Sequence, residues 1–311
     1  MIVVGGEALV DLVPGGSSVE PGLPMLTPRL GGGPYNTALA AGRLDAGVAF
    51  LSRVSTDPFG VALLARLRAS GVDTGLVQRG AEPTTLAVVT LDSHGAAEYG
   101  FYTEGTADRL FTDPGPLPAE TVALSLGTLG MLLEPGASAY EAVLRREFDR
   151  GVLTVLDPNI RADLVGDAAA YRARFASWLP YVRILKLSVE DAAWLADVDT
   201  AAVPDVVREW LYAGVHAVVL TSGAGGIGVY TAEGQRAKVA TPAASVVDTI
   251  GAGDTVHGAL LAWLAERGVR EPHMLSVEGW TSALTFAADA AAITVSRAGA
   301  EPPTRADLHN G

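Results

Sequence analysis

Short apolar runs alternate with longer amphipathic stretches along most of the sequence, and this alternation restricts the folds open to the chain. The runs have the length of strands and are apolar almost throughout, as expected of strands buried on both faces. They are Val48–Leu51, Thr121–Leu126, Leu153–Leu156, Ile184–Leu187 and Ala217–Leu220. The stretches between them repeat apolar residues at helical spacing and are Tyr35–Leu44, Val61–Ala69, Ala139–Asp149, Ala168–Trp178, Val189–Leu195 and Val203–Tyr212. The pattern predicts an α/β fold in which a mostly parallel sheet is covered by helices on both sides.

Two stretches depart from this alternation. Leu12–Leu30 is rich in Gly, Pro and Ser, and Thr84–Leu110 contains two alternating segments, Leu86–Leu91 and Ala97–Tyr102. These segments surround Asp92-Ser-His-Gly95 and predict a hairpin. Together the two stretches suggest a small β-flap on the main domain, although two ordinary surface excursions fit the pattern alone equally well.

The charge balance argues against a nucleic-acid partner. Lys and Arg number 22 against 35 Asp and Glu, a formal net charge of −13, whereas a protein that binds a phosphate backbone needs a basic face. A small anionic ligand remains open, because backbone N–H groups can hold it. With 311 residues the chain can form one large α/β domain or two small ones.

The N-terminal segment MIVVGGEALVDLV reads as a buried first strand. It lacks a basic stretch, carries Glu7 and Asp11 and is broken by Gly5-Gly6, so it does not resemble a signal peptide. No apolar run approaches the roughly 18–20 residues of a membrane span. The absence of cysteine fits a reducing compartment. We therefore expect a cytoplasmic protein without a membrane partner.

Three glycine clusters carry different information. Gly223-Ala-Gly-Gly-Ile-Gly228 matches the G-x-G-x-x-G pattern of dinucleotide-binding proteins, which requires a following helix. Here Val229–Thr231 and Glu233-Gly234 indicate a strand and a turn instead, so NAD binding is disfavoured. A glycine hairpin and a nucleotide-binding loop without the helix both remain open.

A second cluster, Gly31-Gly-Gly-Pro34, precedes the predicted helix that carries Asn36. Glycines at this place let the backbone approach a ligand closely or act as a hinge. A plain flexible loop is the alternative, and the cluster alone favours it.

The third cluster, Asp248-Thr-Ile-Gly-Ala-Gly-Asp254, leads into an amphipathic helix that ends near Arg267-Gly268. Its small residues therefore lie at a helix N-terminus, where unpaired N–H groups and the helix dipole favour anionic charge. Asp254, in the first turn, fits two roles. It is either a helix-stabilising charge of about 0.3–1 kcal/mol or the general base of a phosphoryl transfer. The residues alone do not decide between these roles.

At this point the sequence resembles the PfkB/ribokinase family of carbohydrate kinases. Asp248–Asp254, with Gly258-Ala259 after it, is similar to the C-terminal signature of the family. Gly31–Asn36, followed by Ala40–Leu44 and Asp57-Pro-Phe-Gly60, is similar to the N-terminal signature. The resemblance covers nearly the whole chain.

Two further segments, Gly5–Asp11 and Asp157-Pro-Asn-Ile-Arg161, are most similar to fructokinases and their near relatives. The likeness implies a ribokinase-like three-layer α/β/α fold with a mostly parallel central sheet. It also implies a single domain over residues 1–311, with a small β-lid formed by residues of about 12–30 and 84–110.

The resemblance implies roles for individual residues. Asp254 would take the proton from the attacking hydroxyl, beside an anion hole formed by the backbone of Gly251, Ala252 and Gly253. The sugar would bind to Asp11, Gly31, Gly32, Asn36, Asn159 and Arg161. ATP would contact Lys186, Ser188, Thr221, Gly223 and Gly226. K⁺ would bind at Asp248 and the backbone of Ile250, with the turn at Arg297–Gly299.

The sequence departs from the family at two points. Ser188 replaces the asparagine of an Asn-x-x-Glu motif that places Mg²⁺-bound water on the phosphates, so either Glu190 or Asp191 would face the Mg²⁺. Pro303 stands where a hydroxyl side chain often completes the cation site, which leaves dependence on K⁺ open.

Other residues fit more than one role. Arg161 suits a sugar hydroxyl, a bidentate pair with a carboxylate, or an ordinary surface position. Phe101 and Tyr102 on the flap suit a cover for the apolar face of a sugar or packing in an edge strand. No metal-ligand spacing connects the histidines, and no role is assigned to His94, His216, His257, His273 and His309.

The expected activity is ATP:sugar phosphotransfer onto a primary hydroxyl, with fructose as the leading substrate and Mg²⁺ on the ATP phosphates. Lid closure would exclude water, and an exposed lid edge favours a homodimer. The alternatives are 2-keto-3-deoxygluconate kinase or ribokinase within the family and, outside it, a non-catalytic sugar- or nucleotide-binding regulator. Asp254 argues against the regulator, since a pure binder needs no base.

Overall fold

The computed structural model describes residues 1–15, 24–91 and 97–309. Within these residues the chain forms a ten-stranded sheet and a separate four-stranded sheet. The strands of the larger sheet run in the order β14 (Gly234–Val239), β13 (Ile227–Thr231), β12 (Ala217–Thr221), β11 (Ile184–Ser188), β10 (Leu153–Asp157), β9 (Ala123–Gly127), β1 (Ile2–Gly5), β4 (Val48–Ser55) and β5 (Val72–Asp73), with β6 (Val77–Gly80) also paired to β4. Within the described residues, only the pairs β12–β13 and β13–β14 of this sheet are antiparallel, which confirms a mostly parallel sheet.

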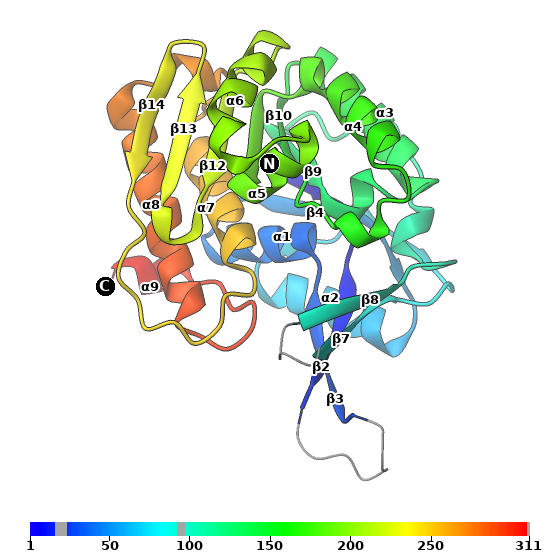
Figure 1. The fold of residues 1–311 in the computed structure, drawn as a ribbon. Helices are drawn as coiled ribbons and strands as arrows, with labels where there is room; N and C mark the ends of the chain where they lie inside the picture. Colours follow the sequence, from blue (N-terminus) through cyan, green and yellow to red (C-terminus); the bar gives the residue numbers. More distant parts are fainter. Residues whose placement is uncertain (16–23, 92–96, 310–311) are drawn as a thin grey trace.

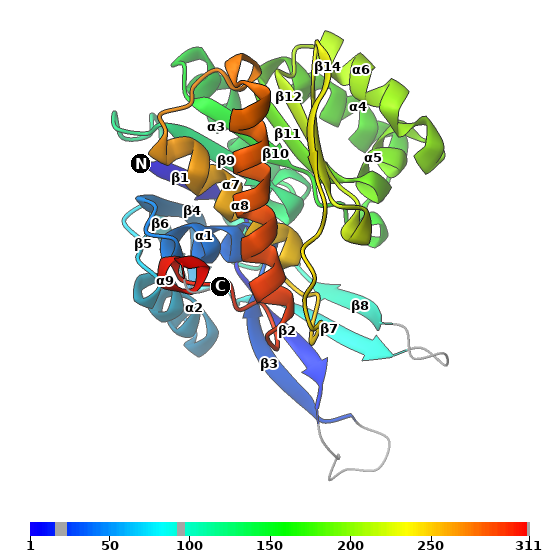
Figure 2. The same cartoon turned by 90° about the vertical axis from the view of Figure 1, so that its left-hand side faces the viewer.

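Helices cover both faces of the larger sheet and make three layers (Figures 1 and 2). One face packs against α1 (Gly33–Arg43), α2 (Pro58–Ala69), α7 (Ala252–Glu266) and α8 (Val277–Val295). The other packs against α3 (Gly136–Asp149), α4 (Ala168–Trp178), α5 (Val189–Ala196) and α6 (Val203–Tyr212). Strand alternation divides the core: Ile2 and Val4 join the first layer and Val3 the second. The short helix α9 (Arg305–His309) follows α8.

The N-terminal segment forms two strands in two sheets, so the prediction of one buried first strand was wrong. β1 lies in the middle of the larger sheet, whereas β2 (Leu9–Pro14) belongs to the smaller one. The chain turns between them at Gly6, whose φ of 146° suits glycine. A Cβ atom there would lie 2.4 Å from Cγ of Pro34. The Gly5-Gly6 pair is therefore a junction between the two sheets.

The smaller sheet has the order β3 (Leu26–Gly31), β2, β7 (Thr85–Leu91) and β8 (Ala97–Tyr102). It projects from the body of the molecule in Figures 1 and 2. β7 and β8 pair antiparallel as a hairpin, while its expected turn, Asp92–Gly95, lies outside the described residues. A small sheet separate from the main one was predicted from the sequence, and it is present.

Helix starts differ from the periodic pattern where capping decides them. α2 begins at Pro58, three residues earlier than expected, because Oδ1 of Asp57 accepts a hydrogen bond from the N–H of Gly60 at 2.8 Å. Short 3₁₀ turns lie at Asp108–Leu110, Thr128–Met131, Ala162–Leu164, Leu179–Tyr181, Thr200–Ala202, Gly223–Gly225 and Pro272–Met274. No helix in the described ranges is long and apolar enough to cross a bilayer.

Candidate active site

A cavity of about 600 Å³ lies between the smaller sheet and the N-termini of α1 and α7. The smaller sheet contributes Asp11, Gly31 and Phe101, and α7 contributes Asp254. Parallel strands present their carboxyl ends at one edge, which is where α/β proteins bind ligands. Further predicted residues on the wall are Gly32, Asn36, Arg161, Asp248, Ile250 and Gly251.

Asp254 is held at the start of α7. Its Oδ2 accepts a hydrogen bond from Nδ2 of Asn36 at 2.9 Å. Burial raises the pKa of Asp254 to about 6, against the opposing effects of the Asn36 hydrogen bond and the positive charge of Lys186. A carboxylate with this pKa is mostly ionised at neutral pH and can accept a proton. Oδ1 of Asn36 is buried and has no hydrogen-bond partner in the described part of the chain.

Gly251 caps α7 in the left-handed conformation, with φ at 76°. The N–H of Ala252 bonds to the carbonyl of Thr249, and that of Thr255 to the carbonyl of Gly251. Between them, the N–H groups of Gly253 and Asp254 enter no backbone bond with the residues that the structure describes. Two free donors at a helix N-terminus, beside a carboxylate, form a site for an anionic group that receives charge during a reaction.

Asp11 and Arg161 face the same cavity from different elements. Burial raises the pKa of Asp11 to about 6, and the charge of Arg161 opposes this rise. A Cβ atom on Gly31 would lie 2.3 Å from Oδ2 of Asp11, so a larger residue there would displace this carboxylate. Nη1 of Arg161 donates to the backbone and side-chain oxygens of Asn159 at 2.9 and 2.8 Å. Asn159 thus holds Arg161 in place and lies behind the cavity wall.

Glu7 is a buried carboxyl group to which the sequence patterns gave no role. It lines the cavity and is 2% exposed. Its Oε1 accepts the N–H of Gly33 at 3.0 Å and its Oε2 that of Gly130 at 3.2 Å. Burial raises the pKa of Glu7 to about 8. Glu7 therefore fixes the glycine loop of the cavity to the end of β9, and the position of an acidic residue just after Gly5-Gly6 is the only sequence sign of it.

The aromatic wall differs from the expected pair. Phe101 lines the cavity, but Tyr102 is 64% exposed and does not. Tyr99 takes the second place, with its ring stacked on Phe101 at a centroid distance of 6.1 Å. The reason is the alternation of side chains along β8, which puts residues 99 and 101 on one face and residue 102 on the other.

A buried polar network lies behind Asp254 and consists of Lys186, Asp157, His257 and Ser125. Nζ of Lys186 donates to Oδ2 of Asp157 at 2.7 Å, and Nδ1 of His257 lies 3.1 Å from the same oxygen. Nε2 of His257 lies 2.9 Å from Oγ of Ser125. Burial opposes the charge on Asp157, but Lys186 and His257 outweigh it and lower the pKa of Asp157 to about 2.

The groups Ser125, His257 and Asp157 are those of a hydrolase triad, but their setting excludes that chemistry. Ser125 and His257 are 3% and 1% exposed, so no substrate carbonyl can reach the hydroxyl. Burial lowers the pKa of His257, which is therefore neutral and can donate from Nδ1 and accept at Nε2. This buried polar network is a fixed support that joins α7 to β9 and β10 and keeps the charge of Lys186 near Asp254.

Of the predicted nucleotide residues, Ser188 and Thr221 lie at the carboxyl ends of β11 and β12, whereas Lys186 is buried in the middle of β11 and bonded to Asp157. Ser188 caps α5 by accepting the N–H of Asp191 at 2.9 Å, and Asp191 accepts the N–H of Ile160 at 3.1 Å. Burial and the negative charge of Asp157 raise the pKa of Asp191. Glu190 is exposed.

Thr221 ends β12, and the glycine cluster follows as a 3₁₀ turn, Gly223–Gly225. The strands β13 and β14 come next, so the predicted strand and turn after this cluster are confirmed. A Cβ atom at Gly226 would lie 2.1 Å from the carbonyl oxygen of Val239, and Gly226 has a φ of 89°. The glycine is required by the turn into β13.

Asp248 joins the two segments predicted to hold a monovalent cation. Its Oδ1 accepts the N–H of Ile250 at 3.0 Å and its Oδ2 that of Gly299 at 2.9 Å. The turn at 297–299 therefore lies beside the loop before α7, as the resemblance implied.

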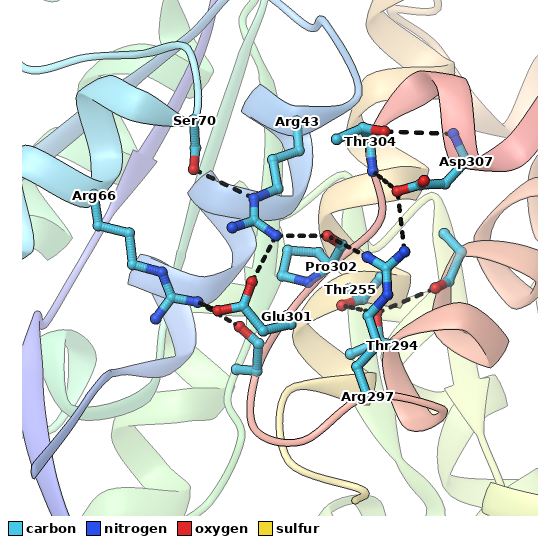
Figure 3. A network of polar contacts seen from close by, with 12 residues as sticks. Arg43, Arg66, Ser70, Thr255, Thr294, Arg297, Glu301, Pro302, Thr304 and Asp307 are labelled. Atoms are coloured by element: carbon cyan, nitrogen blue, oxygen red, sulfur yellow. Dashed lines mark hydrogen bonds and ion pairs between the residues drawn. The ribbon is translucent and has the colours of Figure 1, made fainter. Parts of the chain in front are cut away.

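A polar network holds the C-terminal wall of the cavity in place (Figure 3). Residues 298–301 line the cavity. Arg66 of α2 donates to the carbonyl oxygen of Ala300 at 2.8 Å and to Oε1 of Glu301 at 2.5 Å. Arg43 of α1 donates to Oε2 of Glu301 at 2.8 Å and to the carbonyl of Pro302 at 2.8 Å. One carboxylate thus ties the end of the chain to two N-terminal helices.

Comparisons with known proteins agree with this architecture. The "Fructokinase" of Rhizobium leguminosarum bv. trifolii is 38% identical over 269 residues, which are 85% of this chain and 79% of that protein. A solved fructokinase from Xylella fastidiosa with bound ATP superposes with a TM-score of 0.87, at 27% identity over 99% of this chain and 97% of that one. A fructokinase from Vibrio cholerae O395 with fructose, ADP and a calcium ion gives 0.85, at 26% identity over the same shares. The family model described as "pfkB family carbohydrate kinase" matches residues 1–307. Since this match spans nearly the whole of a chain whose cavity carries both signatures, the protein belongs to the pfkB family of carbohydrate kinases.

Proposed function

We propose that the chain transfers the γ-phosphoryl group of ATP to a primary hydroxyl of fructose. The observation that carries the proposal is the start of α7, where Asp254, with a pKa of about 6, lies beside the free N–H groups of Gly253 and Asp254. Phosphoryl transfer to an alcohol needs these two parts, a base for the hydroxyl proton and donors for the moving phosphoryl group.

The sugar would lie in the 600 Å³ cavity, with its hydroxyls on Asp11, Asn36 and Arg161. Gly31 and Gly32 leave room for close backbone approach, and the rings of Tyr99 and Phe101 would cover its apolar face. The bound fructose and ADP of the Vibrio cholerae relative support this choice of ligand.

The transfer itself conserves atoms and charge in one displacement. Asp254 accepts the proton of the primary hydroxyl while the hydroxyl oxygen forms a bond to the γ-phosphorus and the bond from that phosphorus to the β-bridging oxygen breaks. The free N–H groups of Gly253 and Asp254 would stabilise the transferring group, whereas the N–H of Ala252, predicted to share this role, is bonded to the carbonyl of Thr249. ADP leaves with the electron pair of the broken bond. Lys186, 3.5 Å from the Cβ position of Gly253, adds positive charge to this end of α7.

We further propose that ATP lies over Ser188, Thr221, Gly223 and Gly226, at the carboxyl ends of β11 and β12. A bound Mg²⁺ would neutralise charge on the phosphates. Either Glu190, which is exposed, or Asp191 would contact its water shell. K⁺ would lie beside Asp248 and the backbone of Ile250.

The proposal extends to the whole protein as a single functional unit in the cytoplasm. The smaller sheet would act as the lid. Its edges are β3 and β8, and pairing of these edges between two copies would form a homodimer. Light scattering during size-exclusion chromatography tests the dimer, and a mass of one chain at high protein concentration would remove it.

The function is tested by measuring ADP release with fructose, ribose and 2-keto-3-deoxygluconate, on wild type and Asp254→Asn in parallel. We expect fructose to give the highest kcat/KM. A higher value with the acidic sugar would make Arg161 a carboxylate ligand and replace the assignment within the family. If no sugar releases ADP although fructose binds by calorimetry, the protein is a regulator rather than a kinase.

A further inference from the structure

His216, Glu271 and His273 meet at the edge of the molecule that the kinase site does not use. His216 directly precedes β12, at the opposite end of that strand from Thr221. Glu271 and His273 belong to the connection between α7 and α8, where His273 lies in the 3₁₀ turn Pro272–Met274. The three side chains come from segments more than fifty residues apart in sequence, and among the described residues they are the group with metal-ligand geometry.

The distances between their donor atoms match a metal site. Nδ1 of His216 lies 3.2 Å from Nδ1 of His273 and 3.3 Å from Oε2 of Glu271, and the third side of the triangle is 3.7 Å. Three atoms at these separations lie on a circle with a radius of about 2.0 Å, which is the length of a Zn–N bond, 2.0–2.1 Å. The two imidazole planes are perpendicular, at 89°. A single ion near the centre of this triangle therefore reaches all three atoms at bonding distance.

We propose that these residues bind one divalent transition-metal ion, with Zn²⁺ as the best fit. Two imidazoles and one carboxylate suit zinc, whereas Mg²⁺ and Ca²⁺ prefer oxygen ligands alone. The side chains of His216, Glu271 and His273 are 27%, 45% and 44% exposed, so an ion can enter from solvent and water can complete the tetrahedron.

Arg183 lies outside the triangle and contacts one of its members, Glu271. Its Nη1 donates to both oxygens of Glu271, each at 2.8 Å. A hydrogen bond of this kind orients a ligating carboxylate. The guanidinium charge also repels a cation, so the site is weaker than a buried structural zinc site.

The bound ion would cross-link the connection between α7 and α8 to the start of β12. Because the ion binds the folded chain, it would raise the stability of the fold with concentration. This role is independent of sugar phosphorylation, since no residue of the triangle lines the cavity.

The test is calorimetric titration of the chelator-treated, full-length protein with ZnCl₂, in excess Mg²⁺ to fill oxygen-ligand sites. Wild type should bind one Zn²⁺ per chain, and His273→Ala should lower the affinity at least tenfold. His216→Ala should do the same. Glu266→Gln is the matched control, because it removes a carboxylate at the end of α7 that pairs with Arg305 instead of the triangle, and it should leave the affinity unchanged.

Two further readouts separate a specific site from adventitious binding. Zn²⁺ should raise the Tm of wild type and of Glu266→Gln but not of His273→Ala. In the absence of zinc, His273→Ala should keep the Tm and the ADP release of wild type, because its exposed side chain supports no part of the core. Equal zinc uptake by wild type and His273→Ala, or no uptake by wild type, would overturn the proposal.

Discussion

The ionised form of Asp254 is favoured by the Asn36 amide and the Lys186 ammonium and opposed by burial. Burial has the larger effect, and the resulting pKa of about 6 lies just below neutral pH. A base is most effective when its pKa is near the pH at which it works, since it is then both ionised and basic. The support behind α7 therefore tunes this one carboxylate.

Replacing Asp254 by Asn should lower kcat by roughly 10²–10⁴ and leave the sugar Kd close to wild type. The amide keeps the size of the side chain and its contact with Asn36, but it cannot take a proton. Single-turnover kinetics and sugar calorimetry measure the two quantities. Asp289→Asn, an exposed carboxylate on α8, is the control and should behave as wild type. A variant at position 254 with normal turnover would remove the base assignment.

Enzyme activity should decline on the acidic side of about pH 6. Both Asp254 and Asp11 have a pKa of about 6, raised from 3.8, so both carboxylates are lost to protonation as the pH falls through that value. At saturating sugar, kcat should fall about tenfold per pH unit below 6, while kcat/KM falls more steeply because both groups act. Asp11→Asn should make the two slopes equal. A decline that begins only near pH 4 would contradict the assignment.

Glu7 should make stability depend on pH. Its pKa of about 8 in the folded chain is raised from 4.5, so its contribution is full below about pH 4.5 and is lost as the pH rises through 8. The stability advantage of wild type over Glu7→Gln should therefore shrink between these values, by at most about 1.4 kcal/mol per pH unit. Urea unfolding of both proteins across this range measures it. An advantage that is constant with pH would mean that Glu7 is charged throughout.

At the scale of the element, the first turn of α7 depends on one glycine. Gly251 has a φ of 76°, and a Cβ atom there would lie 2.6 Å from Cβ of Ala300, on the wall that Glu301 holds in place. The turn, the free N–H groups and the C-terminal wall are thus fixed together.

Gly251→Ala should cost about 1–2 kcal/mol of stability and lower kcat more than the sugar affinity. The strain shifts the donors from which the phosphoryl group gains its stabilisation. Gly268→Ala is a matched control at the other end of α7, since Gly268 has a φ of 64° but no atom within 4 Å of its Cβ position. It should lose similar stability and keep its activity. Equal losses of kcat in both variants would point to general strain.

Elements with a clear period were predictable, and those without one were not. The strands and helices of the alternating part lie within a few residues of their expected bounds. In contrast, the extent of α8 was not predicted, because its alanines are crowded between residues 283 and 292 and leave no distinct apolar stripe. The split of the first segment into β1 and β2 was also missed, since both strands are apolar and only the turn at Gly6 separates them.

Candidate site residues were predictable where a motif groups them in sequence. Asp254 and Gly251 follow from their place at a helix start. Glu7 does not, because its partners Gly33 and Gly130 are 26 and 123 residues away and only the fold brings them together. His216 and His273 are 57 residues apart, so no spacing could connect them.

At the scale of the whole molecule, ligand binding should be visible in stability. Fructose at 100 times its Kd should add about 2.7 kcal/mol to the free energy of unfolding, because the unfolded chain has no cavity. Differential scanning fluorimetry measures the rise in Tm. Asp254→Asn should keep the rise and Asp11→Asn should lose most of it, since Asp11 has its role in binding. If Asp11→Asn kept the full rise in Tm, the sugar would bind elsewhere.

The ion pairs of Glu301 with Arg43 of α1 and Arg66 of α2 have a consequence for protein synthesis. A chain leaves the ribosome N-terminus first, so β1, α1 and α2 can fold while the last segments are still being made. Arg43 and Arg66 lack their partner until Glu301 is made, 258 and 235 residues later in the sequence. Until then the cavity has no C-terminal wall. We expect the nascent protein to stay unable to hold its sugar until Glu301 has been made and has reached Arg43 and Arg66.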